Sequence, residues 1–227
     1  MQKKIFYTEW AYVLGLWILA LGTALMERAN FGVSMVVAPA YLLHLKISES
    51  LPFFTFGMAE YTLQAVILIF MMIALRRVKL SYFLSFVTAV IYGFMLDGTM
   101  AAIALIPWSG MIASVCFYIV GMLFCSIGVS LLFHTYFSPE AYELFVKEIS
   151  GKFHLDIHKC KTVYDCVSCG IGIVLSFAFF GLWQFEGVKW GTILCALING
   201  SIIHLCTKCL ESIWTFEDRF PLKKYFR

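Results

Sequence analysis

Six long apolar stretches recur along this chain of 227 residues, and they constrain its fold more than any other feature. A helix that crosses the hydrocarbon core of a bilayer needs about 20 mostly apolar residues. The stretches cover residues 11–26, 56–75, 81–96, 111–133, 163–183 and 190–209. We expect the third to stop at Asp97-Gly98, because the apolar run 100–106 is too short to cross and Pro107 ends it. The sequence predicts an all-α polytopic membrane bundle of six transmembrane helices.

Charged residues make up only 14% of the chain, whereas a soluble domain carries about a quarter. This composition excludes most soluble enzymes, and the lipid bilayer is the expected partner. The net charge of +3 provides no basic surface, so no nucleic-acid partner is expected.

The positions of Lys and Arg predict the orientation. If the N-terminus is cytoplasmic, only Arg28, Lys46 and Lys189 fall outside, which leaves 14 of the 17 basic residues inside. Lys3 and Lys4 before the first stretch would also suit a signal peptide, but no small-x-small cleavage site follows cleanly. We therefore expect a retained first helix and a multi-pass protein of the cytoplasmic (inner) membrane, with both termini cytoplasmic.

The two halves of the chain, residues 1–107 and 108–227, resemble each other. Three residues recur 106 positions apart: Gly22, Phe31 and Lys46 correspond to Gly128, Phe137 and Lys152. Three spans per half would invert the second half, and inverted repeats are typical of transporters. Duplication that merely builds a stable bundle is the alternative.

Each half also carries an extra segment between its first and second spans. Residues 32–47 are apolar and are expected to dip into the membrane or lie on it. Residues 138–151 predict an amphipathic cytoplasmic helix at the interface, with Ser138 as N-cap, Pro139 in the first turn and Gly151 as the stop. A surface loop is the alternative reading. The tail, residues 210–227, follows the sixth span.

Polar residues inside spans are costly, so each is a candidate for an ion or substrate pathway. The candidates are Glu60, Tyr61, Gln64, Tyr92, Asp97, Tyr164, Asp165, Asn199 and His204. We expect Glu60 and Asp97 in an outer layer and Asp165 and His204 in an inner one. The simpler alternatives are a solvated Asp97, a surface pair of Asp165 with Lys161, and an Asn199 that only joins helices.

The eight cysteines include two C-x₂-C pairs, Cys166 with Cys169 and Cys206 with Cys209. Each pair lies on one helix face, so a four-thiolate metal site is possible. The separation of the pairs fits no zinc-ribbon pattern, and cysteine is also a comfortable small apolar residue in a helix. The apolar reading is favoured, and no other cofactor is expected.

Several short motifs point to a known family. Gly22, Phe31-Gly32, Pro39 and Asp97-Gly98 in the first half, with Tyr164-Asp165, Gly191-Thr192 and Asn199-Gly200 in the second, resemble the YczE/YitT-type bacterial integral membrane proteins. The resemblance implies a bacterial cytoplasmic membrane and a permease-like protein, and it implies no reaction. Val33-Ser34 and Ala40-Tyr41 depart from the more polar run expected around Pro39.

The leading hypothesis is a small-molecule or ion transporter, or the substrate-binding subunit of one, with proton coupling as one option. The alternative is an assembly factor that binds a membrane or cytoplasmic protein through residues 137–161 and 216–227. An intramembrane metal or thiol enzyme ranks last, because the chain carries no Gly-x-Ser-x-Gly elbow, no HExxH and no phosphate loop.

Overall fold

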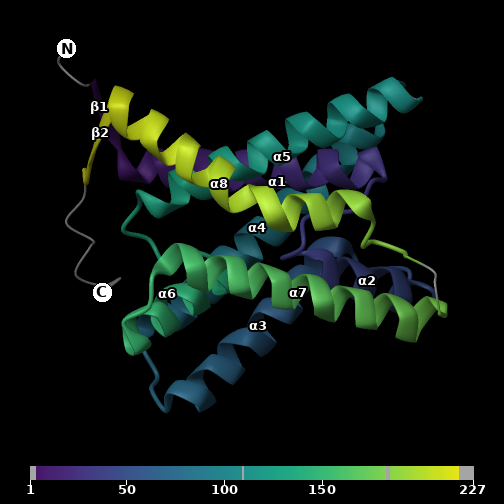
Figure 1. Cartoon of the computed structure of the whole chain (residues 1–227), viewed down its shortest axis with the longest axis horizontal. Coiled ribbons are helices and arrows are strands. Elements are labelled where there is room, and N and C mark those ends of the chain that lie inside the picture. The colour runs from purple at the N-terminus through teal and green to yellow at the C-terminus, as the bar shows by residue number, and fades with distance from the viewer. Residues whose placement is uncertain (1–3, 109, 183–184, 220–227) are drawn as a thin grey trace.

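The computed structural model describes residues 4–108, 110–182 and 185–219, which fold into eight helices and two short strands (Figure 1). The helices are α1 (Thr8–Ala29), α2 (Ala38–Ser48), α3 (Phe56–Leu75), α4 (Leu80–Ala104), α5 (Met111–Phe133), α6 (Ala141–Phe153), α7 (Ile157–Phe180) and α8 (Trp190–Ile213). All except α2 and α6 are long and apolar enough to cross a membrane, which makes six candidate spans. The prediction of six helices long and apolar enough to span a membrane is confirmed. Residue 183, the predicted end of the fifth span, and residues 220–227 of the tail lie outside the described residues.

The predicted end of the third span is wrong, because α4 continues through Asp97-Gly98 to Ala104. The Asp97 carboxylate accepts hydrogen bonds from Thr55 Oγ1 at 2.7 Å and from the Gly57 amide at 2.8 Å, so it is satisfied without leaving the helix. A single Gly costs a helix only about 1 kcal/mol relative to Ala. Asp97 is therefore a partner of the first turn of α3 and not simply a solvated group.

The predicted boundaries of the amphipathic helix are also wrong. Glu140 occupies the N-cap position of α6, and Gly151 lies inside the helix, which ends at Phe153 with His154 in the left-handed region at φ 52°. The first turn is buried against α3 and α4. A lone amphipathic segment reads as a surface helix, but here neighbouring helices cover both its apolar stripe and its first charged residues.

The centre of the bundle is the crossing of α1 with α5. A Cβ atom added at Gly22 would lie 2.6 Å from the Cys125 amide nitrogen and 2.7 Å from the Gly121 carbonyl oxygen. Gly15 approaches Gly128 in the same way, so the two helices run antiparallel. Small residues permit this close approach of backbones. Helix α4 packs beside α1, and α8 packs beside α5.

The remaining helices form a second group below this crossing in Figure 1. Helix α2 lies between α3 and α7 near one end of the bundle, and α6 contacts the same two helices near the other. The two short helices thus fill the space between spans that do not follow each other in sequence.

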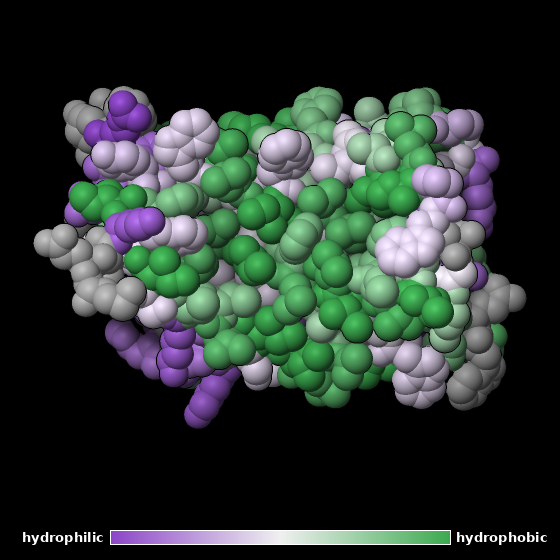
Figure 2. Space-filling model, turned by 90° about the horizontal axis from the view of Figure 1, so that it is seen from above, coloured by the Kyte–Doolittle hydropathy of each residue, from purple (hydrophilic) through white to green (hydrophobic). Residues whose placement is uncertain are grey.

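Two short strands, which the sequence did not predict, pair the segment before α1 with the segment after α8. Strand β1 (Lys4–Tyr7) pairs in parallel with β2 (Trp214–Glu217) in the register Lys4↔Trp214. The start of α1 and the end of α8 therefore lie on the same side of the bundle, which we call the ribbon side. Figure 2 shows an apolar middle between two ends that carry more polar side chains, as a membrane-embedded surface requires.

The central crossing makes a stability prediction. Replacing Gly22 by Ala should lower the free energy of unfolding by about 1–3 kcal/mol, because the new methyl group meets backbone atoms that cannot move without separating α1 from α5. Gly98→Ala is the matched control. It lies in α4 with nothing within 4 Å of the added Cβ and should raise stability by about 0.5–1 kcal/mol. Thermal unfolding in detergent would measure both, and equal effects of the two variants would contradict the prediction.

Candidate functional site

Six polar side chains are buried together where α6 begins, between α3 and α7. We call them the acidic cluster: Glu60 and Gln64 from α3, Glu140 and Glu143 from the start of α6, and Lys161 and Asp165 from α7. None of the six residues is more than 8% exposed. The contacts of α6 with both α3 and α7 bring these side chains into one place.

Gln64 links the first part of the cluster. Its Nε2 donates to Glu60 Oε1 at 3.3 Å and to Glu140 Oε2 at 3.2 Å, and its Oε1 accepts from the Ala141 amide at 2.9 Å. The first amides of a helix lack acceptors within that helix. Because Glu140 makes no side-chain cap bond, α3 supplies an acceptor to α6 through Gln64.

Lys161 links the second part. Its Nζ lies 2.9 Å from Asp165 Oδ1, one turn later on α7, and 3.5 Å from Glu143 Oε1. The reading of this pair as a surface contact is wrong, since Asp165 is 1% exposed and Lys161 is 8% exposed. The reason is that α6 packs against this face of α7.

The cluster holds four carboxyl groups and one ammonium group, so its charge would be −3 if every member were ionised. Burying unbalanced charge costs several kcal/mol per ion. Glu60 Oε2 and Glu140 Oε1 accept no hydrogen bond from the described residues. Burial first, and then the carboxylates of Glu143 and Glu60, raise the pKa of Glu140 well above its ordinary value. The arrangement therefore favours a proton on Glu140.

An aromatic wall borders the cluster. Tyr164 lies 6.4 Å from Tyr142 and 5.6 Å from Phe145, measured between ring centroids. Tyr92 is buried nearer the centre of the bundle, where its hydroxyl group hydrogen-bonds Thr23 Oγ1 at 2.9 Å.

The structure unites some of the predicted site residues and separates others. Glu60, Gln64, Tyr164 and Asp165 lie at or beside the acidic cluster, although Glu60 and Asp165 were expected in different layers. Asp97 lies apart from them, at the first turn of α3.

The other predicted residues have different neighbours. Tyr61 is close to Gly93, where α3 crosses α4. Asn199 Oδ1 accepts from Ser126 Oγ at 2.9 Å and so joins α8 to α5, which is the structural role considered for it. His204 lines the cavity described next.

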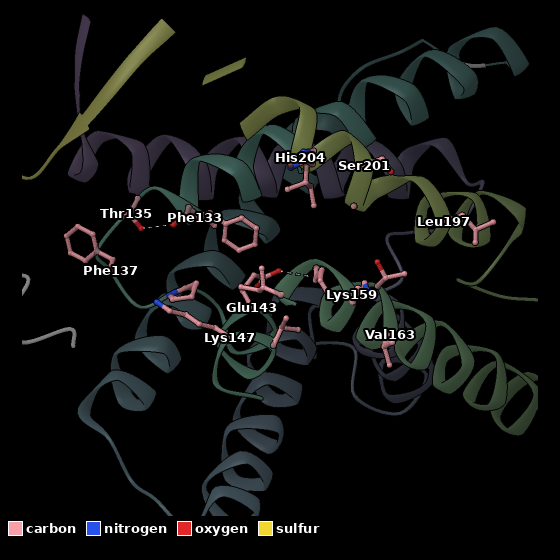
Figure 3. A pocket seen from close by; sticks show the side chains of 18 residues that line it. Phe133, Thr135, Phe137, Glu143, Lys147, Lys159, Val163, Leu197, Ser201 and His204 are labelled. Carbon is pink, nitrogen blue, oxygen red and sulfur yellow. Dashed lines mark hydrogen bonds and ion pairs between the residues drawn. The ribbon is translucent and has the colours of Figure 1, made fainter. Parts of the chain in front are cut away.

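A cavity of about 940 Å³ opens beside the cluster, between α6 and α7 on one side and α5 and α8 on the other (Figure 3). Glu143 and Lys161 belong to its lining, so the cavity reaches the charged groups directly. Ser201 and His204, on α8, lie on the side of the cavity opposite Glu143. A second cavity, of about 600 Å³, lies between the other ends of α7 and α8 and is lined mainly by apolar side chains.

Sequence reasoning missed three members of the cluster as site residues: Glu140, Glu143 and Lys161. Two spacings could have indicated them. Glu140 and Glu143 are three positions apart and flank Tyr142 of the apolar stripe, and Lys161 is four positions before Asp165. Neither spacing shows by itself that the charges are buried, because burial depends on how α6 packs.

The cysteines do not gather. Cys166 and Cys209 are exposed, whereas Cys169 is buried. Across residues 4–108, 110–182 and 185–219, no three His, Cys, Asp or Glu side chains are placed to hold a metal ion.

Comparison with known proteins gives one match, to a protein family. Neither a search of curated proteins nor a search of solved structures found a match. The model of a family described as "Family of unknown function (DUF6198)" matches residues 6–208, which is most of the chain. The link to YczE/YitT-type proteins stays a prediction. The chain, with its six candidate membrane spans, therefore belongs to the DUF6198 family, whose function is unknown.

Proposed function

We propose that this protein is a proton-coupled transporter of a small molecule or ion, built from two inverted three-span repeats. The observation that carries the proposal is the acidic cluster: four buried carboxyl groups and one lysine, beside a cavity, within a bundle of six candidate spans. Ionisable groups inside membrane proteins commonly mark ion pathways and proton relays.

Helix contacts support the repeat. In such a repeat the first four helices, α1 to α4, correspond in order to the last four, α5 to α8. The contact of α1 with α4 then corresponds to that of α5 with α8, and the contact of α2 with α7 corresponds to that of α6 with α3. All four contacts are present. The residues correspond in the same way. Ser85 Oγ donates to the Pro139 carbonyl at 2.6 Å, and Thr192 Oγ1 donates to the Val33 carbonyl at 2.8 Å. The acceptors Val33 and Pro139 are 106 positions apart and the donors Ser85 and Thr192 are 107 apart, close to the offset of the proposed repeat.

Aromatic contacts follow the same exchange. Tyr12 packs on Phe137 with ring centroids 4.5 Å apart, and Tyr118, 106 positions later, meets Phe31 at 6.0 Å. A pseudo-twofold axis through the α1–α5 crossing accounts for both contacts. Transporters with this architecture carry their sites at the interface between repeats.

The two halves differ in a way that suits alternating access. Helices α3 and α4 touch through backbone, because a Cβ at Gly93 would lie 2.9 Å from the Gly57 carbonyl oxygen. The corresponding helices α7 and α8 are further apart: a Cβ at Gly200 would meet only Thr162 Oγ1, at 3.9 Å. A carrier that rocks one repeat against the other would exchange these two arrangements.

The two glutamates at the start of α6 have no acidic counterparts in the first half of the chain. The positions 106 residues before Glu140 and Glu143 are Ser34 and Val37, which cannot exchange a proton. We place the ribbon side in the cytoplasm, because this orientation puts 14 of the 17 basic residues inside and 3 outside. The cavity beside Glu143 then opens in the cytoplasmic half of the protein. A substrate bound next to this cluster changes its affinity for protons, and proton binding changes the affinity for substrate by the same factor.

Proteoliposomes test the proposal. Purified protein is screened with a panel of organic acids, amines and inorganic ions while trapped pyranine reports proton movement. We expect at least one substrate to move protons with it and to accumulate when a pH gradient is imposed. Glu140→Gln should retain substrate exchange and lose accumulation by at least about tenfold, because an amide cannot carry the proton. Glu49→Gln, at an exposed ion pair with Lys46, is the control.

Two outcomes would contradict the proposal. Flux equal to that of empty liposomes across the panel would count against transport. Flux that ignores the pH gradient in the wild-type protein would reject proton coupling alone.

A further inference from the structure

The larger cavity combines an apolar interior with cationic groups at its rim. Leu132, Val146, Val163, Leu197 and Ile203, from four different segments, supply much of the apolar lining. Its volume of about 940 Å³ lies within the range of about 300–1,000 Å³ that is typical of small-molecule sites.

The charges at the rim are unequal. Of the lining residues, Glu143 and Lys161 already pair with each other, and Lys161 also pairs with Asp165. Lys147 on α6 and Lys159 on α7 are exposed and form no ion pair with another residue in the described part of the chain. In Figure 3 both lie on the wall opposite Ser201 and His204. The free charge at this cavity is therefore positive.

We propose that this cavity binds a single-chain amphipathic carboxylate, whose anionic group pairs with Lys147 and Lys159 and whose apolar chain lies between α7 and α8. Val163 and Leu197 line the cavity and are themselves exposed, so the chain can reach the cavity from the hydrocarbon core of the membrane. A cation is disfavoured by the lysines. A phospholipid with two acyl chains exceeds the drug-sized ligands that cavities of this volume hold.

If the bound carboxylate is the transported substrate, this inference rests on the proposed function. Binding itself can be measured without any transport assay. Native mass spectrometry of the intact protein in dodecyl maltoside, with sodium dodecanoate as the probe, should show one bound dodecanoate. The double variant Lys147→Gln/Lys159→Gln should weaken binding by about tenfold, as expected when two exposed charge pairs are lost. Lys152→Gln is the matched control, because Lys152 lies on α6 outside the cavity lining and should leave binding unchanged.

A second variant tests where the chain lies. Gly200 lines the cavity with free space beside it, so Gly200→Leu should fill part of the cavity and weaken dodecanoate binding, whereas Gly200→Ala should retain most of it. Thermal unfolding of both variants shows that the fold is intact.

Two results with other ligands would overturn the inference: dodecyltrimethylammonium that binds as tightly as dodecanoate, or phosphatidylglycerol that displaces dodecanoate at equal concentration. Two results with variants would also overturn it: unchanged dodecanoate binding in the double lysine variant, or unchanged binding in a folded Gly200→Leu protein. Dodecanoate binding without flux of any substrate would keep the ligand class and reject transport.

Discussion

Replacing Lys161 by Met is expected to lower the free energy of unfolding by about 3–5 kcal/mol. Lys161 is the only cation that the structure places in the acidic cluster, and it contacts two buried carboxyl groups. Removing one partner of a buried ion pair leaves charge without compensation, which costs about this much. For a chain of this size the loss corresponds to a fall in Tm of roughly 10 °C, measurable by thermal unfolding in detergent.

Two further variants separate this effect from loss of any lysine. Lys46→Met removes an exposed i,i+3 pair with Glu49 and should change stability by less than about 1 kcal/mol. The triple variant Lys161→Met/Glu143→Gln/Asp165→Asn removes the uncompensated charge and should regain most of the stability. A Lys161→Met protein as stable as Lys46→Met would show that the cluster is not charged in the way its geometry implies.

The six spans were predictable because each depends on a local property, namely a run of apolar residues long enough to cross a bilayer. Their ends were less predictable. Asp97-Gly98 has the composition of a helix end, but the Asp97 carboxylate accepts hydrogen bonds from Thr55 and Gly57, which lie 42 and 40 residues away in sequence. A tertiary contact satisfies the group that local reasoning assigned to solvent.

The strands illustrate the same limit more strongly. Each has only four residues and adjoins a long helix, and the pairing joins Lys4 to Trp214 across almost the whole chain. A short strand is stable only with a partner, and nothing local to either segment identifies the other.

The candidate site was predictable in part. Glu60, Gln64 and Asp165 were identified because a polar residue inside an apolar run is visible in sequence. Glu140 and Glu143 lie in a segment with ordinary surface composition, and only the packing of α6 between α3 and α7 shows that they are buried. The sequence thus indicated the site residues on α3 and α7, whereas those on α6 could be identified only from the fold.

Raising the pH should destabilise the protein through Glu140. Burial and the neighbouring carboxylates raise the pKa of this residue above the value of 4.5 that we take for the unfolded chain. Between the ordinary and the raised pKa, the folded protein holds a proton that the unfolded chain has released. The free energy of unfolding therefore falls with rising pH, by at most about 1.4 kcal/mol per pH unit for one such group. Below pH 4.5 both states are protonated, and this dependence disappears.

Glu140→Gln isolates this contribution, because its amide resembles the protonated acid and does not titrate. We expect Tm of the wild-type protein in detergent to fall from pH 5 to pH 7 relative to that of the variant, by roughly 2–4 °C per pH unit. Groups that do not interact with Glu140 contribute equally to both proteins and cancel in the difference. Glu148→Gln, on the same helix in a half-exposed pair with Lys79, should leave the wild-type pH dependence in place. Parallel Tm curves for wild type and Glu140→Gln would show that Glu140 is ionised throughout this range, and would contradict its proposed role as the proton carrier.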